Sequence, residues 1–159
     1  MSNQFIFVTG GARSGKSRFA EEFIKKSCSK VLYIATAIPF DDEMKERIRH
    51  HRAARPSNWN TCEAYYSLGS VIDKASSDNY DGIVVDCLTI MVTNLMLDYA
   101  HEWDLVSEDE AELVERRIMK EIDEMTAALK RFNGKSAVVS NELGMGIVPE
   151  YRFARIFRD

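Results

Sequence analysis

The sequence predicts a single α/β domain in which a mostly parallel β-sheet lies between two layers of helices. Short, continuously apolar runs alternate along the chain with longer amphipathic segments, the pattern of parallel strands joined by helices. The 159 residues, of which 45% are hydrophobic and 29% charged, also have the size and composition of one globular domain. We therefore assign residues 1–159 to one three-layer domain.

Four apolar runs are the predicted strands of this sheet. They are Phe5–Val8, Val31–Ala35, Ile83–Val85 and Ala137–Val139. None of them alternates between apolar and polar residues, so each is expected to be buried on both faces.

Between and after these strands lie segments with apolar residues at helical spacing. The predicted helices are Ser17–Lys26, Asp42–Ala54, Leu88–Tyr99 and Glu108–Phe132. Ser107 and Glu110 fit a capping box at the start of the longest helix, and Asn133–Gly134 is a suitable stop.

Charge, hydropathy and cysteine content exclude several classes of function. The 25 acidic and 21 basic residues give a net charge of −4, which disfavours a protein that coats nucleic acid. No apolar run approaches the ~18 residues of a membrane-spanning helix, and the N-terminus has no export signal. Cys28, Cys62 and Cys87 are widely spaced, so we expect a reduced, cytoplasmic protein without disulfides.

A phosphate-binding loop follows the first predicted strand. The residues match G-x-x-x-x-G-K-[ST] in full and are Gly10, Gly11, Ala12, Arg13, Ser14, Gly15, Lys16 and Ser17. The glycines let successive N–H groups turn toward phosphate oxygens, and the positive end of the following helix adds to the attraction. Lys16 is expected to reach the β- and γ-phosphates, and Ser17 to offer its hydroxyl to Mg²⁺.

A metal at such a loop needs a carboxylate, and Asp86 is the candidate. It follows the predicted strand Ile83–Val85, and ligands of open α/β sheets collect at the carboxyl ends of the strands. Asp86 is also placed to cap the next helix, a role compatible with metal binding.

The predicted helix over 42–54 carries a second candidate site. Arg47, His51 and Arg55 are spaced at i−4, i and i+4, so they are expected to lie one above the other. His51 is expected to face the protein, and His50 is rotated from it by about 100°. A neutral imidazole between guanidinium groups is able to attack phosphorus. The alternative is an ordinary charged surface helix ended by Pro56.

Taken in order, these motifs resemble a known family, the bifunctional adenosylcobinamide kinase / adenosylcobinamide-phosphate guanylyltransferases. The resemblance runs nearly from end to end. Its motifs are Gly10–Ser17, Tyr33–Ala37, Asp42–Met44, Arg47–Ile48, His50–His51, Arg55–Pro56, Trp59, Asp86–Thr89, Ser140–Glu142, Gly144–Glu150 and Arg155–Asp159.

The resemblance implies two reactions of cobalamin assembly. GTP or ATP phosphorylates the aminopropanol hydroxyl of adenosylcobinamide. GMP is then transferred from GTP to that phosphate through a covalent guanylyl-histidine, which yields adenosylcobinamide-GDP and pyrophosphate. The position that matches the modified histidine is His51, with His50 as the alternative.

The resemblance also implies a set of nucleotide-binding residues and an assembly. Beside the phosphate loop and Asp86, the implied GTP contacts are Ala35, Thr36, Ala37, Arg52, Ala53, Ala54, Arg55 and Glu63. Glu63 belongs to no motif of its own. The family has a RecA-like P-loop fold and forms homotrimers, and its chains continue past Asp159 through another strand, so a C-terminal strand is expected to be missing here.

Two other functions are consistent with parts of the sequence. An ordinary small-molecule kinase would use the same phosphate loop without forming a covalent intermediate. A RecA-like nucleic-acid motor would need a basic stripe with aromatic platforms, and the acidic chain offers only the short segment 47–55. The residues do not decide whether GTP or ATP serves the kinase step.

Overall fold

The computed structural model describes residues 3–39, 42–53, 55–144 and 149–158. Within these ranges, four side chains of one helix lie outside the description. They belong to Glu43, Met44, Arg47 and His51.

Strands and helices alternate along the chain, as the sequence predicts. The strands are β1 (Gln4–Gly10), β2 (Val31–Ala35), β3 (Asn60–Glu63), β4 (Gly82–Asp86) and β5 (Lys135–Asn141). The helices are α1 (Lys16–Lys25), α2 (Asp42–Ala53), α3 (Leu68–Ser77), α4 (Leu88–Tyr99), the 3₁₀ helix η1 (Trp103–Leu105), α5 (Glu108–Arg131) and α6 (Arg152–Arg158).

The strands form one five-stranded sheet in the order β1-β5-β4-β2-β3, and every neighbouring pair is parallel. This confirms the α/β fold with a parallel sheet. The four predicted strands are all present. The sequence reading missed β3 and the helix that follows it, α3.

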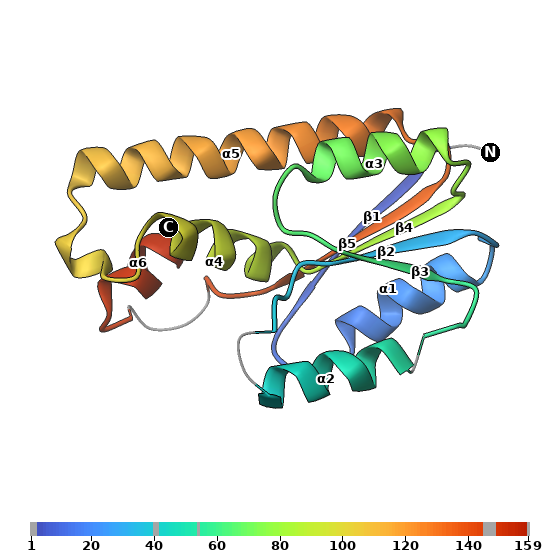
Figure 1. Cartoon of the computed structure of the whole chain (residues 1–159), viewed down its shortest axis with the longest axis horizontal. Helices are drawn as coiled ribbons and strands as arrows, with labels where there is room; N and C mark the ends of the chain where they lie inside the picture. Colours follow the sequence, from blue (N-terminus) through green and yellow to red (C-terminus); the bar gives the residue numbers. More distant parts are fainter. Residues whose placement is uncertain (1–2, 40–41, 54, 145–148, 159) are drawn as a thin grey trace.

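Helices cover both faces of the sheet (Figure 1). On one face, α3 and α5 pack over a core that includes Ile72, Ile83 and Phe132. On the other face, Ala20 and Ile24 of α1 pack over the core that includes the strand side chains of Val31, Tyr33 and Val84. α2 lies on the same side as α1, farther from the sheet (Figure 1).

The prediction that β1 is buried on both faces is wrong. Ile6 and Val8 pack against the core beneath α1, but Phe5 and Phe7 are 52% and 53% exposed. The reason is the strand order: β1 lies at the edge of the sheet, and β5 is its one partner among the described strands. The other three predicted strands are almost entirely buried.

A smaller group of helices extends beyond the carboxyl end of the sheet. α4, η1 and α6 gather there beneath the first half of α5 (Figure 1). Trp103, Val106 and Val114 are buried at its centre. The predicted capping box is confirmed, since the Ser107 hydroxyl accepts from the Glu110 N–H and the Glu110 carboxylate accepts from the Ser107 N–H. In the part of the chain that is described, no helix is long and apolar enough to cross a membrane.

Candidate active site

The phosphate loop connects β1 to α1 at the carboxyl end of the sheet. Ser14 N–H donates to the Gly11 carbonyl at 3.3 Å, which closes a turn, and Lys16 Nζ donates to the same carbonyl at 3.0 Å. The lysine ammonium is therefore folded back over the loop that its backbone helps to form. Because an ammonium group can exchange this carbonyl for a phosphate oxygen, Lys16 is available to an incoming triphosphate.

The loop depends on glycine at two points. Gly15 has φ of +85° at the N-cap of α1, a conformation that L side chains rarely adopt. A Cβ at Gly10 would lie 2.8 Å from Ser14 Oγ, so a larger residue would force the Ser14 hydroxyl to move. The spacing of glycines in the motif is thus explained by the backbone that the loop adopts.

Three strand ends meet beside the loop at one level of the sheet. Ala35 of β2 is paired with Asp86 of β4 on one side and with Glu63 of β3 on the other. No sequence motif predicted a role for Glu63, because β3 is short and only half-buried and has no apolar run. The ladder with β2 brings its carboxylate to the same edge as Asp86.

Asp86 is held by a buried phenol. The Tyr33 hydroxyl donates a short hydrogen bond to Asp86 Oδ2, and Tyr33 is only 1% exposed. Burial, and then the charge of Asp86, raise the pKa of Tyr33 well above its usual range. The phenol therefore stays protonated and remains a donor, which fixes one oxygen of the carboxylate and leaves the other for a ligand.

Arg55 lies over the face of the Tyr33 ring. Its guanidinium carbon is 3.4 Å from the ring centroid, and its Nη1 donates to Thr61 Oγ1 at 3.3 Å. Its Nε is 3.8 Å from Glu21 Oε1, and the arginine side chain is only 7% exposed. Burial raises the pKa of Glu21, an effect that the nearby Arg55 partly offsets. Glu21, Tyr33, Arg55 and Asp86 thus form one partly buried ionic cluster beneath the loop.

The expected stacking of Arg55 above His51 stays a prediction, because the His51 side chain lies outside the described residues. α2 ends at Ala53, and Arg55 leaves the helical row to pack on Tyr33. The cause is Pro56, since the residue before a proline is driven out of the helical conformation.

Thr36 joins the ends of two strands from within. Its hydroxyl donates to the Cys87 carbonyl at 2.7 Å and accepts from the Cys87 N–H at 2.8 Å. Its own carbonyl accepts from Asn94 Nδ2 at 2.8 Å, and its N–H donates to the Asp86 carbonyl at 3.0 Å. With its polar groups used internally, Thr36 holds the β2 and β4 ends in register, between the flanking residues Ala35 and Ala37.

The end of β5 completes the wall beside the phosphate loop. Glu142 N–H donates to the Gly10 carbonyl at 3.0 Å, and Asn141 Nδ2 donates to Thr89 Oγ1 at 3.1 Å. A shallow hollow of about 240 Å³ opens here, lined by residues of α4, the β5 end and α6. Three larger hollows, of about 600, 500 and 450 Å³, lie along α5. The segment over 145–148, which belongs to one of the motifs, lies outside the described residues.

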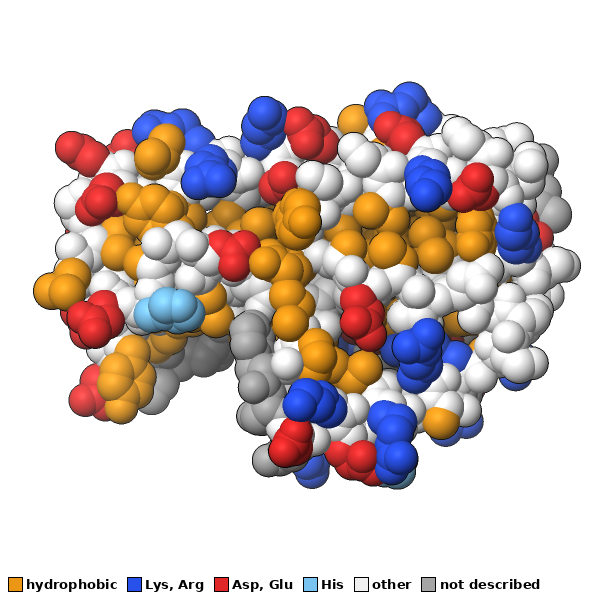
Figure 2. All heavy atoms as spheres, viewed as in Figure 1, with side chains coloured by type: hydrophobic (Ala, Val, Ile, Leu, Met, Phe, Trp, Pro, Cys, Tyr) orange, Lys and Arg blue, Asp and Glu red, His pale blue; other side chains and the backbone are white. Residues whose placement is uncertain are grey.

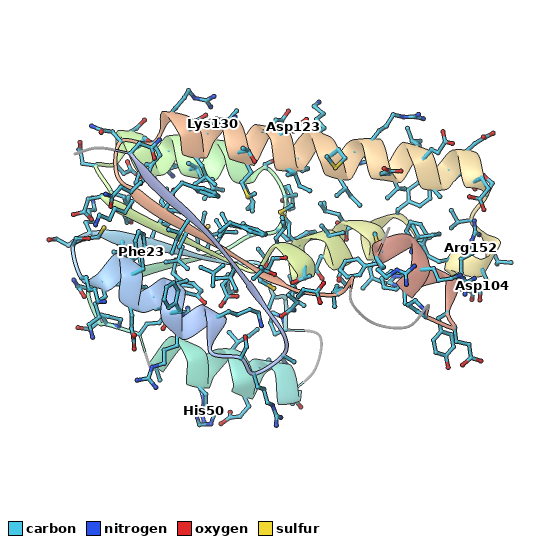
Figure 3. The ribbon with its side chains drawn as sticks, turned by 180° about the vertical axis from the view of Figure 1, so that it is seen from behind. Phe23, His50, Asp104, Asp123, Lys130 and Arg152 are labelled. Atoms are coloured by element: carbon cyan, nitrogen blue, oxygen red, sulfur yellow. The ribbon has the colours of Figure 1, made fainter. Side chains whose placement is uncertain are left out.

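The histidine helix α2 is the least buried of the elements beside the loop. His50 is exposed, with its Nε2 3.4 Å from Glu46 Oε1, and its side chain points away from α1 and the sheet (Figure 3). Arg52 and Ala53 are also exposed. The backbone of His51 lies in α2, but its side chain, and all of Ala54, lie outside the described residues. The orientation predicted for His51 therefore stays a prediction.

Acidic and basic side chains are interspersed on the lower part of the molecule, where α2 lies (Figure 2). Lys45 and Arg49 both form ion pairs within the helix, with Asp42 and Glu46. Such exposed pairs contribute little to stability, about 0.3–0.5 kcal/mol each.

Among the described residues, no group of three or more His, Cys, Asp or Glu side chains could hold a metal ion by itself. A nucleotide-bound Mg²⁺ needs less, because it keeps several waters and shares phosphate oxygens with one or two protein ligands. The free oxygen of Asp86 and the hydroxyl of Ser17, the second residue of α1, suit that donor set.

Comparison with known proteins adds an independent finding. A family model described as "Cobinamide kinase / cobinamide phosphate guanyltransferase" matches residues 6–159. The match includes the phosphate loop, the histidine helix and the wall formed by β5 and α6.

Curated relatives agree with this match. The chain is 49% identical over 154 residues to the "Bifunctional adenosylcobalamin biosynthesis protein CobU" of Escherichia coli, which covers 97% of this chain and 83% of the relative. It is 48% identical to the protein of the same name from Salmonella typhimurium, with the same coverage. It is 37% identical over 152 residues to the "Bifunctional adenosylcobalamin biosynthesis protein CobP" of Pseudomonas aeruginosa, covering 96% of this chain and 79% of the relative.

Proposed function

This chain belongs to the cobinamide kinase / cobinamide phosphate guanyltransferase family and is a bifunctional enzyme of cobalamin biosynthesis, and we propose how its residues divide the two reactions. Its substrates are a cobinamide and a nucleoside triphosphate. The phosphate loop and Asp86 serve the phosphates of the nucleotide in both reactions. The histidine helix serves the second reaction alone.

In the kinase step, the terminal hydroxyl oxygen of adenosylcobinamide attacks the γ-phosphorus of GTP or ATP. The bond from that phosphorus to the β–γ bridging oxygen breaks, the nucleoside diphosphate leaves with the electron pair, and the hydroxyl proton is lost to solvent. Lys16 and the loop N–H groups bind the oxygens on which negative charge accumulates. Mg²⁺ held by Ser17 and Asp86 neutralises charge on the phosphates when it is bound.

In the transferase step, an imidazole nitrogen of α2 attacks the α-phosphorus of GTP, and pyrophosphate leaves. A phosphate oxygen of adenosylcobinamide phosphate then attacks the same phosphorus, and the histidine is released. We assign the nucleophile to His51, with His50 as the alternative one residue away. A guanylyl-histidine divides one difficult transfer into two easier ones.

The guanosine is proposed to lie between the sheet edge and α2. Ala35, Ala37 and Glu63 would form the sheet side of this space, and the fully buried Thr36 would support them from behind. Arg52, Ala53, Ala54 and Arg55 would contribute from the end of the histidine helix. Arg55 is engaged with Tyr33 in this structure, so we assign it to the wall of the site.

The observation that carries the proposal is the meeting of the phosphate loop, Asp86 and Glu63 at one edge. The parallel register alone places Asp86 and Glu63 on either side of Ala35. The segment that follows α2 enters the same place through Arg55. The phosphate loop and the segment that follows the histidine helix therefore both adjoin the carboxyl end of the sheet.

The test is covalent labelling with GTP that carries a radioactive α-phosphate. Wild-type protein is expected to become labelled through a phosphoramidate that is stable in base and lost in acid. His51→Ala should abolish the label while phosphorylation of adenosylcobinamide stays within about twofold of wild type, since the kinase step needs no imidazole. His50→Ala, which alters the neighbouring imidazole, is the matched control.

Each result has a defined meaning. Loss of label in His50→Ala alone moves the nucleophile by one residue and leaves the covalent mechanism intact. A wild-type enzyme that phosphorylates adenosylcobinamide but never becomes labelled would refute the covalent step and leave an ordinary kinase.

The assembly and the cellular location are proposed as well. The resemblance to the family supports a homotrimer, which light scattering of the purified protein would test. The free thiols of Cys28, Cys62 and Cys87 support a reducing, cytoplasmic environment. Fractionation of cells that express the full chain would test the location.

A further inference from the structure

Tyr33 is the one residue of the ionic cluster that contacts both halves of the proposed site. Its hydroxyl donates to Asp86, on the phosphate side. Its ring carries the guanidinium of Arg55, two residues beyond the histidine helix. Tyr33 itself is buried in the middle of β2, so its position is fixed by the core.

Among the described residues, Arg55 connects the end of the histidine helix to the rest of the protein. The ion pairs of the described α2 residues stay within the helix. Arg55, by contrast, reaches Tyr33 of β2, Thr61 of β3 and Glu21 of α1. A guanidinium on an aromatic face away from water is attracted to the ring more strongly than one at an exposed site.

The attachment of Arg55 to α1 is incomplete. Its Nε is buried and has no hydrogen-bond partner among the described residues, and the nearest carboxylate oxygen, on Glu21, is 3.8 Å away. A shift of under about 1 Å would convert this ion pair into a hydrogen bond. The contact between the loop-bearing helix α1 and the end of α2 is therefore able to tighten without any rearrangement of the core.

From these contacts we propose that Tyr33 is a positioning residue for both reactions: its hydroxyl orients Asp86 for the metal–nucleotide complex, and its ring seats Arg55, which sets the position of the histidine helix. The inference rests on the proposed function and adds to it two separable roles within one side chain. Neither role involves contact between Tyr33 and a substrate.

The chain offers a matched control at the opposite end of the sheet. The Tyr80 hydroxyl accepts from Asn60 Nδ2 at 2.8 Å, and Lys30 Nζ lies 4.6 Å from the centroid of its ring. Tyr80 thus combines a hydrogen-bonded hydroxyl with a cation on its ring, as Tyr33 does. It lies two residues before the start of β4, whereas the proposed site lies at the carboxyl ends of the strands.

The first variant, Tyr33→Phe, removes the hydroxyl and keeps the ring. We expect the Mg²⁺ concentration that half-saturates binding of a fluorescent GTP analogue to rise about tenfold, because a hydrogen bond to a charged group is lost. The rate of histidine labelling at saturating Mg²⁺ should stay within about twofold of wild type, because Arg55 still packs on the aromatic ring. The binding readout requires no turnover.

The second variant, Arg55→Met, removes the cation and keeps Tyr33. We expect the labelling rate to fall about tenfold while the Mg²⁺ requirement for binding stays within about twofold. Arg55→Lys restores the charge and should recover part of the labelling rate, which a general loss of packing would not produce. Tyr80→Phe should leave both measurements unchanged.

The result that overturns the proposal is a Tyr33→Phe protein that changes both measurements together, or neither of them. Thermal unfolding of each variant identifies any that fail to fold, and Tyr33→Phe, which keeps the buried ring, decides the question if Arg55→Met does not fold. A wild type that is never labelled refutes the covalent transfer instead, and the Mg²⁺ measurement still tests the role of the hydroxyl.

Discussion

α1 and α2 follow successive strands and lie on the same side of the sheet, yet they are held in different ways (Figure 1). α1 buries Ala20 and Ile24 completely against the strands. Every described side chain of α2 is exposed or half-buried. The helix that follows the phosphate loop is thus part of the core, whereas the described side chains of the histidine helix include none that is fully buried.

This difference corresponds to the two kinds of chemistry. A phosphate cradle works by presenting fixed N–H groups and a fixed ammonium, so it benefits from a rigid helix. The proposed nucleophile would have to reach the α-phosphorus in one reaction and stay clear in the other, so it would benefit from a helix that opens easily. The predictions below test whether the molecule is divided in this way.

The largest expected effect is on the rigid side. Lys16→Met removes the ammonium over the loop, and we expect the rate of adenosylcobinamide phosphorylation to fall about 10³-fold, since charge on the transferred group loses its stabiliser. Steady-state turnover measures this. Lys25→Met, at the other end of α1, is the control and should stay near wild type. Equal losses in both variants would show that α1 charge in general, rather than Lys16, supports the reaction.

Core truncation should distinguish the two helices next. Ile24→Ala on α1 is expected to lower the free energy of unfolding by about 3 kcal/mol, because the side chain is fully buried. Ile48→Ala on α2 should cost about 1 kcal/mol or less, because its side chain is only half-buried. Urea denaturation measures both. Similar costs at the two positions would contradict the comparison.

Amide hydrogen exchange should separate the helices without any substitution. We expect the amides of α2 to exchange at least about tenfold faster than those of α1 in the nucleotide-free protein, because few buried contacts oppose local opening. Mass spectrometry of peptides that cover each helix measures the rates. Addition of GTP should reduce the difference between the exchange rates of the two helices. Equal rates in the nucleotide-free protein would mean that α2 is as firmly held as α1.

The smallest effect is expected from the exposed ion pairs of α2. Glu46→Gln removes the partner of Arg49 and His50 and should change the free energy of unfolding by no more than about 0.5 kcal/mol. Thermal unfolding at low and at high salt measures the change. A cost above about 1 kcal/mol would mean that these pairs, rather than Arg55, hold the helix.

The same comparison explains how much the sequence could predict. The buried strands and the phosphate loop could be predicted because continuous apolar runs and a fixed glycine spacing are compatible with few alternative structures. β3 was not predicted because Asn60–Glu63 is short and half-buried, and it becomes a strand only through its ladder with β2. Glu63 was consequently placed by resemblance alone.

The ionic cluster could not be predicted for a different reason. Tyr33 reads as one more apolar residue of a buried strand, and Arg55 reads as the next turn of a basic helix. Their contact depends on where the chain goes after Pro56, which local spacing does not determine. The edge position of β1 is likewise a property of strand order, so the exposure of Phe5 and Phe7 could not be read from their apolar run.

The length of α5 has a mechanical consequence. Its 24 residues make a rod of about 36 Å that packs on α3 at one end and covers α4 and η1 at the other (Figure 1). Arg152 of α6 ties that far end together, donating to the Trp103 carbonyl and to Glu108 of the rod. The wall contributed by α4 and α6 is therefore held firmly in place by α5. If a cobinamide enters between this wall and the histidine helix, we expect the helix rather than the wall to move.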